Sequence, residues 1–139
     1  MPVQHINSDG AFVHAMSVAT TPYVCVDLSA EWCGPSKTIE PFFEQLSGKY
    51  PTVTFLKVDV DQCPGVSNTY GVGTVPVFIM FLQGVQMDMV RGADARALEL
   101  MVYKHAIDQQ EPDDKDVLEQ FAQQLAQSLH LEAAEREMM

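Results

Sequence analysis

Basic side chains and cysteines are scarce in this sequence, and each shortage excludes a class of function. Among its 139 residues, 19 are acidic and only 8 are lysine or arginine, so the formal net charge is −11. So acidic a chain repels the phosphates of nucleic acids and of anionic lipids, and we expect neither nucleic acid nor a membrane as a partner. Three cysteines are too few for the disulfide framework of a small secreted domain. Reduced thiols and a cytoplasmic location are therefore expected.

Long apolar runs and metal-ligand spacings are absent from the sequence as well. No apolar run approaches the ~20 residues that a transmembrane helix needs. The opening "MPVQHINSDG" has neither the basic region nor the apolar region of a signal peptide, so none is expected. The four histidines are scattered, and none pairs with a cysteine at the spacing of a zinc site. We therefore expect no metal and no other cofactor.

What the sequence does contain is an alternation of strand-like and helix-like segments. Apolar and β-branched stretches typical of buried strands lie at residues 3–6, 21–30, 53–60, 75–84 and 85–92. Helix-like segments lie at residues 7–19, 36–50, 65–71 and 93–108. In the first of them, Ser8 or Asp9 is expected to cap the helix, with Phe12, Val13 and Met16 facing the core. The order β-α-β-α-β-α-β-β-α predicts an α/β domain with a central mixed sheet flanked by helices.

A change of pattern after this domain predicts a boundary near residue 110. Pro112 ends the last helix, so we divide the chain into a domain at 1–110 and an acidic linker with a helical extension at 111–139. Residues 115–137 are predicted to form one amphipathic helix. Its apolar stripe needs a surface to cover it, which is the domain itself, a second copy of the chain, or a protein partner. The stripe consists of Val117, Phe121, Leu125 and Leu129.

The segment "VDLSAEWCGPSK" at residues 26–37 contains the candidate nucleophile, Cys33. It follows a predicted strand and begins a predicted helix, where unpaired backbone N–H groups and the helix dipole stabilise negative charge. A cysteine thiolate is the attacking group in thiol–disulfide exchange. The other interpretation is a buried and inert cysteine. Trp32, Gly34 and Pro35 argue against it, because this glycine and proline suit an exposed helix start.

Several separated motifs together resemble the thioredoxin family. "VDLSAEWCGPSK" resembles the junction of strand, active site and helix, and residues 55–84 ("FLKVDVDQCPGVSNTYGVGTVPVFIMFLQG") resemble the second half of that fold. "RGADARALE" at 91–99 resembles its last strand and helix. The resemblance implies a thioredoxin fold and a protein-disulfide reductase. Its partners would be disulfide-containing proteins and a thioredoxin reductase or another thiol donor.

Ser36 stands where the resemblance implies a second, resolving cysteine. A hydroxyl is too weak an acid to attack a mixed disulfide, and it forms no stable bond to sulfur, so activity is expected to be lost or impaired. Three interpretations remain open. Ser36 is an engineered substitution in a dithiol site, which its surroundings favour, or the chain is a natural monothiol protein that uses an external thiol. In the third, the protein is a non-catalytic adaptor that docks through residues 115–137.

Two charged residues are candidates for proton transfer near Ser36. Asp27 lies in the middle of an apolar strand, where a carboxyl group must be paired or must hold its proton. By resemblance it matches the buried acid of thioredoxins, and Lys57 matches the lysine close to that acid. An exposed strand lysine is an equally good interpretation of Lys57. Cys25 is expected in the core and Cys63 as a half-buried thiol without a role.

Pro76 is the candidate for the proline that thioredoxins hold in the cis form beside the active site. The alternative is an ordinary proline at the start of a strand. The resemblance also implies that substrate lies along an apolar rim and bonds to the backbone before this proline like an added strand. The predicted rim residues are Trp32, Gly34, Pro35, Thr74, Val75, Pro76 and Gly92.

Overall fold

The structure, a computed structural model, describes residues 2–110 and residue 126. The helix predicted at 115–137 lies outside these residues, apart from that single position. Within them the order of elements predicted from the sequence is confirmed. The elements are β1 (Gln4–Ile6), α1 (Asp9–Val18), β2 (Tyr23–Ser29), α2 (Gly34–Lys49), β3 (Thr54–Asp59), α3 (Pro64–Thr69), β4 (Val77–Leu82), β5 (Val85–Arg91) and α4 (Ala95–Gln110).

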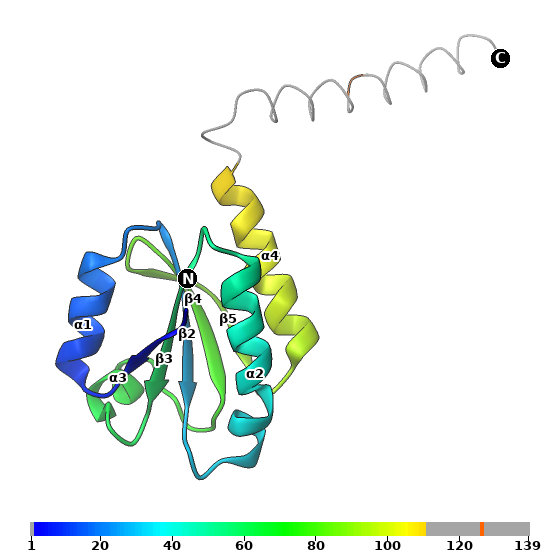
Figure 1. Ribbon diagram of the computed structural model, residues 1–139. Helices are drawn as coiled ribbons and strands as arrows, with labels where there is room; N and C mark the ends of the chain where they lie inside the picture. The colour runs from blue at the N-terminus through cyan, green and yellow to red at the C-terminus, as the bar shows by residue number, and fades with distance from the viewer. Residues whose placement is uncertain (1, 111–125, 127–139) are drawn as a thin grey trace. The chain divides into compact units, whose positions relative to one another are not determined.

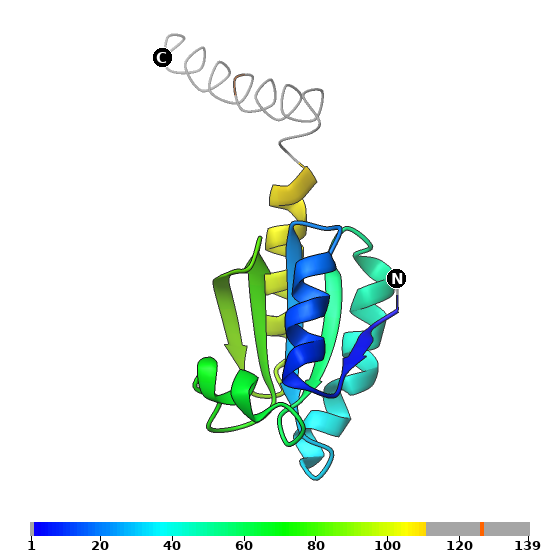
Figure 2. The same ribbon diagram turned by 90° about the vertical axis from the view of Figure 1, so that its left-hand side faces the viewer.

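The strands form one mixed sheet in the order β1-β3-β2-β4-β5. β1, β3 and β2 run parallel, whereas β4 is antiparallel to β2 and to β5. Helices α1 and α3 cover one face of this sheet, and α2 and α4 cover the other, as the two views show (Figures 1 and 2). β2 therefore lies at the centre of the sheet, and all seven of its residues are buried.

Alternation along the strands divides the core into two layers. Tyr23 and Cys25 of β2 belong to the layer between the sheet and helices α2 and α4. Val24 and Val26 belong to the layer on the other face, with α1 and α3. Because successive side chains of a strand point to opposite faces, Asp27 lies on the α2 side with Tyr23 and Cys25. The sheet thus directs this carboxyl group toward the helix that begins after Cys33.

Helix α1 shows where the predicted apolar stripe was wrong. Ser8 caps the helix as expected, since its Oγ accepts a hydrogen bond from the backbone N–H of Ala11 at 3.0 Å. Phe12 and Ala15 are buried, whereas 66% of Val13 is exposed to solvent. At 100° per residue, a helix that turns Phe12 to the sheet turns its neighbour away from it. In this helix only the positions of Phe12 and Ala15 are buried, and Met16 is half-buried at the edge of that face.

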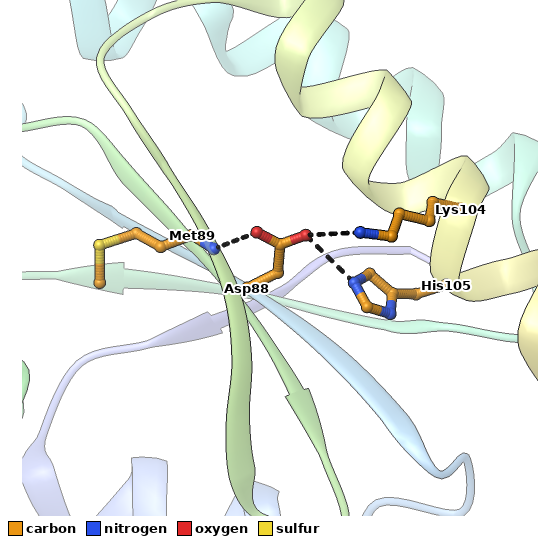
Figure 3. Close-up of polar contacts among 4 residues, drawn as sticks. All are labelled: Asp88, Met89, Lys104 and His105. Atoms are coloured by element: carbon orange, nitrogen blue, oxygen red, sulfur yellow. Dashed lines mark hydrogen bonds and ion pairs between the residues drawn. The ribbon is translucent and has the colours of Figure 1, made fainter.

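Helix α4 is attached to the edge strand β5 by a polar cluster (Figure 3). His105 Nε2 lies 3.2 Å from Asp88 Oδ2, and Lys104 Nζ lies 3.9 Å from the same oxygen. The other oxygen, Asp88 Oδ1, accepts the backbone N–H of Met89 at 2.8 Å. The imidazole is 6% exposed and its ring centroid lies 5.3 Å from that of Tyr23 on β2. One buried histidine therefore joins the helix to two strands.

The start of α3 depends on a side chain from α1. The carboxylate of Asp9 accepts hydrogen bonds from the backbone N–H groups of Gly65 at 3.1 Å and Val66 at 2.9 Å. A β-carbon on Gly65 would lie 2.8 Å from Asp9 Oδ2, so a larger residue there would displace the Asp9 carboxylate from these hydrogen bonds. Asp9 thus supplies the acceptor that a short helix lacks within its own sequence.

Replacing Asp9 with alanine should destabilise the domain, because two N–H groups of α3 lose their acceptor. We expect the free energy of unfolding to fall by about 1–2 kcal/mol, the usual cost of losing a side-chain cap. Chemical denaturation measures this change. Asp9→Asn keeps one carbonyl oxygen and should fall between the parent and the alanine variant. Equal stability of all three proteins would contradict this account of α3.

Candidate redox site

Cys33 lies at the junction where the central strand passes into helix α2. It is the N-cap residue of α2, and Gly34 and Pro35 form the start of the helix. The backbone N–H of Cys33 donates to the carbonyl of Ala30 at 3.1 Å, and the Cys33 carbonyl accepts from Lys37 at 3.2 Å. A proline in the first turn gives up no hydrogen bond, since an N–H there has no partner within the helix. The sequence therefore fixes the thiol at a helix N-terminus.

The thiol faces the loop that contains Pro76. Cys33 Sγ lies 3.5 Å from the carbonyl oxygen of Val75, and the Val75–Pro76 peptide bond is cis. Gly92 closes this loop against the end of β5, where its N–H donates to the Pro76 carbonyl at 2.8 Å. Its φ of +91° is a conformation that glycine adopts without strain. Cysteine, proline loop and glycine thus come together from three distant parts of the chain.

Trp32 forms one side of this surface. Its side chain is 72% exposed, and its indole N–H donates to Asp61 Oδ2 at 2.7 Å. The N–H of Asp61 in turn donates to Asp59 Oδ1 at 3.0 Å, at the end of β3. The indole is therefore held in place while its rings remain open to solvent. Sequence reasoning missed Asp61, although its position two residues beyond a strand end beside the Cys33 junction was a usable signal.

The remaining rim residues surround the thiol on the exposed side. Gly34, Pro35 and Thr74 are exposed, and Val75 is half-buried. Pro76 is buried beneath them. Val75 is the predicted rim residue whose contact with the Cys33 sulfur is recorded among the described residues, and the rim as a substrate surface stays a prediction.

Ser36 lies behind Cys33 and not on this surface. It is 3% exposed, and its Oγ is buried without a hydrogen-bond partner among the described residues. Leaving a hydroxyl unpaired in the interior costs roughly 1–3 kcal/mol. A thiol is a weak donor that tolerates an apolar setting much better. The surroundings of position 36 are therefore better suited to sulfur than to oxygen.

Asp27 is buried in the sheet on the side covered by α2. It is 0% exposed, and within the described part of the chain neither carboxyl oxygen has a hydrogen-bond partner of good geometry. In the parallel pairing of β2 with β3, Asp27 lies opposite Lys57. The Lys57 ammonium binds elsewhere, since its Nζ lies 2.7 Å from Oε1 of Glu40 on α2. Sequence reasoning placed Lys57 near the acid but missed Glu40, which lies one turn beyond Ser36.

Burial raises the pKa of Asp27 from 3.8 to about 7. Loss of hydration is the largest cause, because it penalises the charged carboxylate. The positive charge of Lys57 and the nearby Ser29 hydroxyl oppose this rise, and the negative charge of Glu40 adds to it. The Ser29 hydroxyl lowers the pKa of Asp27 without forming a well-aligned hydrogen bond. Burial has the larger effect, so the net shift of the pKa is upward. A carboxyl group with a pKa near 7 can exchange a proton at neutral pH.

A polar cavity of about 220 Å³ adjoins this group of residues. Its walls include Ser29, Ser36, Glu40 and Lys57. A neighbouring cavity of about 250 Å³ shares Ser29 and Lys57 and extends along the ends of β1 and β3 to Asp59. Position 36 is therefore reached from solvent through charged side chains on one side. On the other side it adjoins the Cys33 turn.

The other two thiols lie in the core. Cys25 and Cys63 are both 0% exposed, and the three cysteines are free. Burial is the main cause that raises the pKa of each thiol, and nearby carboxylates raise it further. Cys63 was expected to be half-buried but is fully covered, with its Sγ 3.7 Å from the carbonyl of Ile6. Both are therefore poor nucleophiles.

The described residues contain neither a metal-type cluster of side chains nor a membrane-spanning helix. Over residues 2–110 and 126, no three His, Cys, Asp or Glu side chains are grouped as a metal site would require. In the same part of the chain, no helix combines the length and apolarity needed to cross a bilayer.

The α/β fold and the thiol at the start of α2 define a class of redox proteins, and comparison with known proteins identifies the family. The family model described as "Thioredoxin" matches residues 4–104. Thioredoxins of horse and human are 44% and 43% identical over 100 residues, which is 72% of this chain and 95% of each relative. The chain belongs to the thioredoxin family of thiol–disulfide oxidoreductases.

Solved structures agree with this assignment. Reduced Schistosoma mansoni thioredoxin pre-protein superposes with a TM-score of 0.71 at 35% identity, covering 75% of this chain and 98% of that one. A mutant of Entamoeba histolytica thioredoxin gives a TM-score of 0.66 at 38% identity, covering 73% and 98%. The thioredoxin fold expected from the sequence is confirmed.

Cys33 should react with alkylating reagents before the other two thiols. It is the partly exposed thiol at a helix start, whereas Cys25 and Cys63 are covered and have raised pKa values. Limited iodoacetamide at neutral pH followed by peptide mass spectrometry should show label on Cys33 alone. In urea all three should be labelled, which provides the control. Preferential labelling of Cys25 or Cys63 in the folded protein would refute the assignment.

The raised pKa of Asp27 predicts that the free energy of unfolding depends on pH. Between pH 3.8 and about pH 7, Asp27 holds a proton in the folded protein but has released it in the unfolded chain. The contribution of Asp27 to the free energy of unfolding therefore falls as pH rises through this window. Relative to the parent, Asp27→Ala should gain about 1.4 kcal/mol of unfolding free energy for each pH unit there. Urea denaturation between pH 4 and pH 8 tests it.

Leu28→Ala is the matched control for this series. Leu28 is the next residue of β2, is equally buried, and has no titratable group. Its cost should be the same at every pH, since only a cavity is created. A constant difference between parent and Asp27→Ala across the window would show that Asp27 is ionised throughout.

Proposed function

We propose that this protein exchanges disulfides with protein substrates through Cys33, and that Ser36 stops the cycle after the first step. The observation that supports it most directly is the position of the thiol. Cys33 lies at a helix start, partly exposed, with its sulfur 3.5 Å from the Val75 carbonyl and an exposed indole beside it. A substrate disulfide can reach this sulfur without any opening of the fold.

In the proposed first step the Cys33 thiolate attacks one sulfur of a substrate disulfide. A bond forms between Cys33 and that sulfur, the substrate disulfide breaks, and the second substrate sulfur leaves as a thiolate that takes a proton from water. The extended substrate segment would lie along the rim and bond to the backbone of Val75 like an added strand. Trp32, Gly34, Pro35, Thr74 and Gly92 would provide the surrounding contacts.

The second step needs a thiol at position 36, and Ser36 has none. The mixed disulfide would persist until an external thiolate attacks one of its two sulfurs. Attack on the Cys33 sulfur would form a disulfide between Cys33 and the external thiol and release the substrate thiolate. Attack on the substrate sulfur would form a disulfide with the substrate and release the Cys33 thiolate. We propose that Ser36 replaces a cysteine in a dithiol site by design. The buried, unpaired Oγ supports this, because a thiol would be accommodated there at lower cost. The Entamoeba histolytica relative is likewise a designed mutant, by its name a cysteine-to-serine exchange.

In the restored dithiol site, Asp27 would act as the proton acceptor for position 36. Its pKa near 7 suits a group that must both accept and release a proton at neutral pH. Lys57 would adjust that pKa through its charge. A thioredoxin reductase or another thiol donor in the cytoplasm would then regenerate the reduced site. No cofactor is needed within the chain for either exchange step.

The decisive test is insulin reduction by this protein and by its Ser36→Cys variant, with dithiothreitol as the donor. We expect the variant to precipitate insulin B chain at least ~10²-fold faster, since only it can resolve the mixed disulfide. In a separate incubation with insulin and no dithiothreitol, the parent should accumulate an adduct on non-reducing gels, and dithiothreitol added afterwards should remove it. Cys33→Ser in the Ser36→Cys background is the control, and it should show neither activity nor adduct.

The other outcomes separate the competing functions. Glutathione-dependent activity of the parent, equal to that of Ser36→Cys, would identify a natural monothiol enzyme instead. Inactivity of both forms, with no adduct on Cys33, would favour an adaptor that docks through residues 115–137.

A further inference from the structure

Glu40 is the one charged residue of the buried site that the proposed function leaves without a role. It lies on α2 one turn beyond Ser36, so both side chains project from the same side of the helix. Asp27 and Lys57 lie opposite each other on adjacent strands and project toward the same layer. Helix and sheet therefore bring a lysine and two carboxyl groups to one place behind position 36.

Asp27 and Glu40 are the two carboxyl groups close to Lys57, and the Lys57 ammonium binds Glu40. Its Nζ lies 2.7 Å from Glu40 Oε1, while both oxygens of Asp27 lack a hydrogen-bond partner of good geometry. The side chain of Glu40 is 34% exposed, whereas Asp27 is 0% exposed. A partly hydrated carboxylate is the cheaper partner, because an ion pair with Asp27 would require complete dehydration of its charge. Glu40 thus determines where the ammonium lies.

The position of the ammonium also determines what lies next to position 36. Lys57 and Glu40 form part of the wall of the 220 Å³ cavity, and Ser36 and Ser29 form another part. Asp27 itself is not among the residues that line this cavity. If the ammonium moved inward, it would leave the cavity wall and approach that carboxyl group.

We propose that Glu40 is a positioning residue of the redox site. It holds the Lys57 ammonium at the cavity wall and away from Asp27, so that Asp27 can exchange a proton with the group at position 36 at neutral pH. The effect of Glu40 on the reaction rests on the proposed dithiol chemistry. With Ser36→Cys, the Asp27 carboxylate takes the proton of the introduced thiol, and that thiolate attacks the Cys33 sulfur of the mixed disulfide. The substrate thiolate leaves and takes a proton from water.

The charges around Asp27 all bear on this proposal. On its own strand lies the Cys25 thiol, and Lys57 faces it from β3. Glu40 faces it from α2, and the residues of β4 opposite it are uncharged. Around the cavity lie His5 on β1, Glu31 in the turn before Cys33, and Lys37 on α2. The charge of Lys57 lowers the pKa of Asp27 and the charge of Glu40 raises it, so the variants below must separate direct repulsion by Glu40 from its hold on Lys57.

The experiment compares Glu40→Gln with the parent by NMR titration of the Asp27 side-chain carboxyl carbon. Removing Glu40 frees Lys57 to act on Asp27, so we expect the Asp27 titration midpoint to fall by ~1 pH unit. Glu44→Gln is the matched control. Glu44 lies one turn further along α2, and the contact of its side chain is with His5 at 3.9 Å, so the same loss of charge should leave the Asp27 midpoint in place. An unchanged midpoint in Glu40→Gln overturns the proposal.

A second pair of variants separates positioning from simple repulsion between carboxylates. With Lys57→Met there is no ammonium to hold, so adding Glu40→Gln should move the Asp27 midpoint much less than it does in the parent. An equal shift in both backgrounds would show that Glu40 acts directly on Asp27 and not through Lys57. A purely structural ion pair would change the denaturation midpoint and leave the Asp27 titration unchanged.

The consequence for the reaction is measured in the Ser36→Cys background. The pH dependence of insulin reduction should shift to lower pH in Glu40→Gln, by the same amount as the Asp27 midpoint, and remain in place in Glu44→Gln. If Ser36→Cys is inactive, the proposed function fails while the titrations still decide the inference. If Ser36→Cys is active and adding Glu40→Gln leaves its pH profile unchanged, the inference fails and the proposed function stands.

Discussion

The burial of one carboxyl group in the central strand is the constraint on which the redox site depends. Asp27 is fully covered because β2 lies in the middle of the sheet and α2 lies over it. That burial raises the pKa of Asp27 to about 7, and the charges of Lys57 and Glu40 then shift it in opposite directions. The same strand continues into the turn that begins α2, so the buried acid and the partly exposed Cys33 thiol are positioned by one continuous segment. The fold therefore fixes the spacing between acid and nucleophile through backbone hydrogen bonds alone.

Local sequence was sufficient for the features that are themselves local. The thiol at a helix start could be predicted because Gly34 and Pro35, which directly follow Cys33, favour the start of a helix. The cap at Ser8 and the succession of strands and helices follow in the same way from short-range patterns. Val13 was placed wrongly because a short apolar cluster does not fix the phase of a helix, and the sheet decides which side is covered. Even so, the errors lie within elements and not in their order.

Residues that act across the fold were the ones that sequence reasoning missed. Asp9 caps α3 from 56 residues away, and Asp61 binds the indole of Trp32 from 29 residues away. Glu40 meets Lys57 only because β3 lies in a particular register beneath α2. Asp9 and Glu40 are common acidic residues with nothing unusual in their neighbours, whereas Asp61 had one local signal, its position just beyond a strand end. Such contacts depend on strand order and register, which the sequence of one segment does not contain.

The structure separates the two halves of the proposed cycle in space. Attack on a substrate uses the outer surface, where Cys33 lies between an exposed indole and the Val75 carbonyl. Resolution would use the inner side, where position 36, Asp27 and the Lys57–Glu40 pair lie around or behind a polar cavity. Ser36 affects only the inner half, since its side chain points away from the surface that meets substrate. A buried acid with a pKa near neutrality brings no benefit to a site that stops at the mixed disulfide, and it lowers stability above its pKa. A thiol at position 36, as proposed above, would give this buried acid a use that a serine there does not.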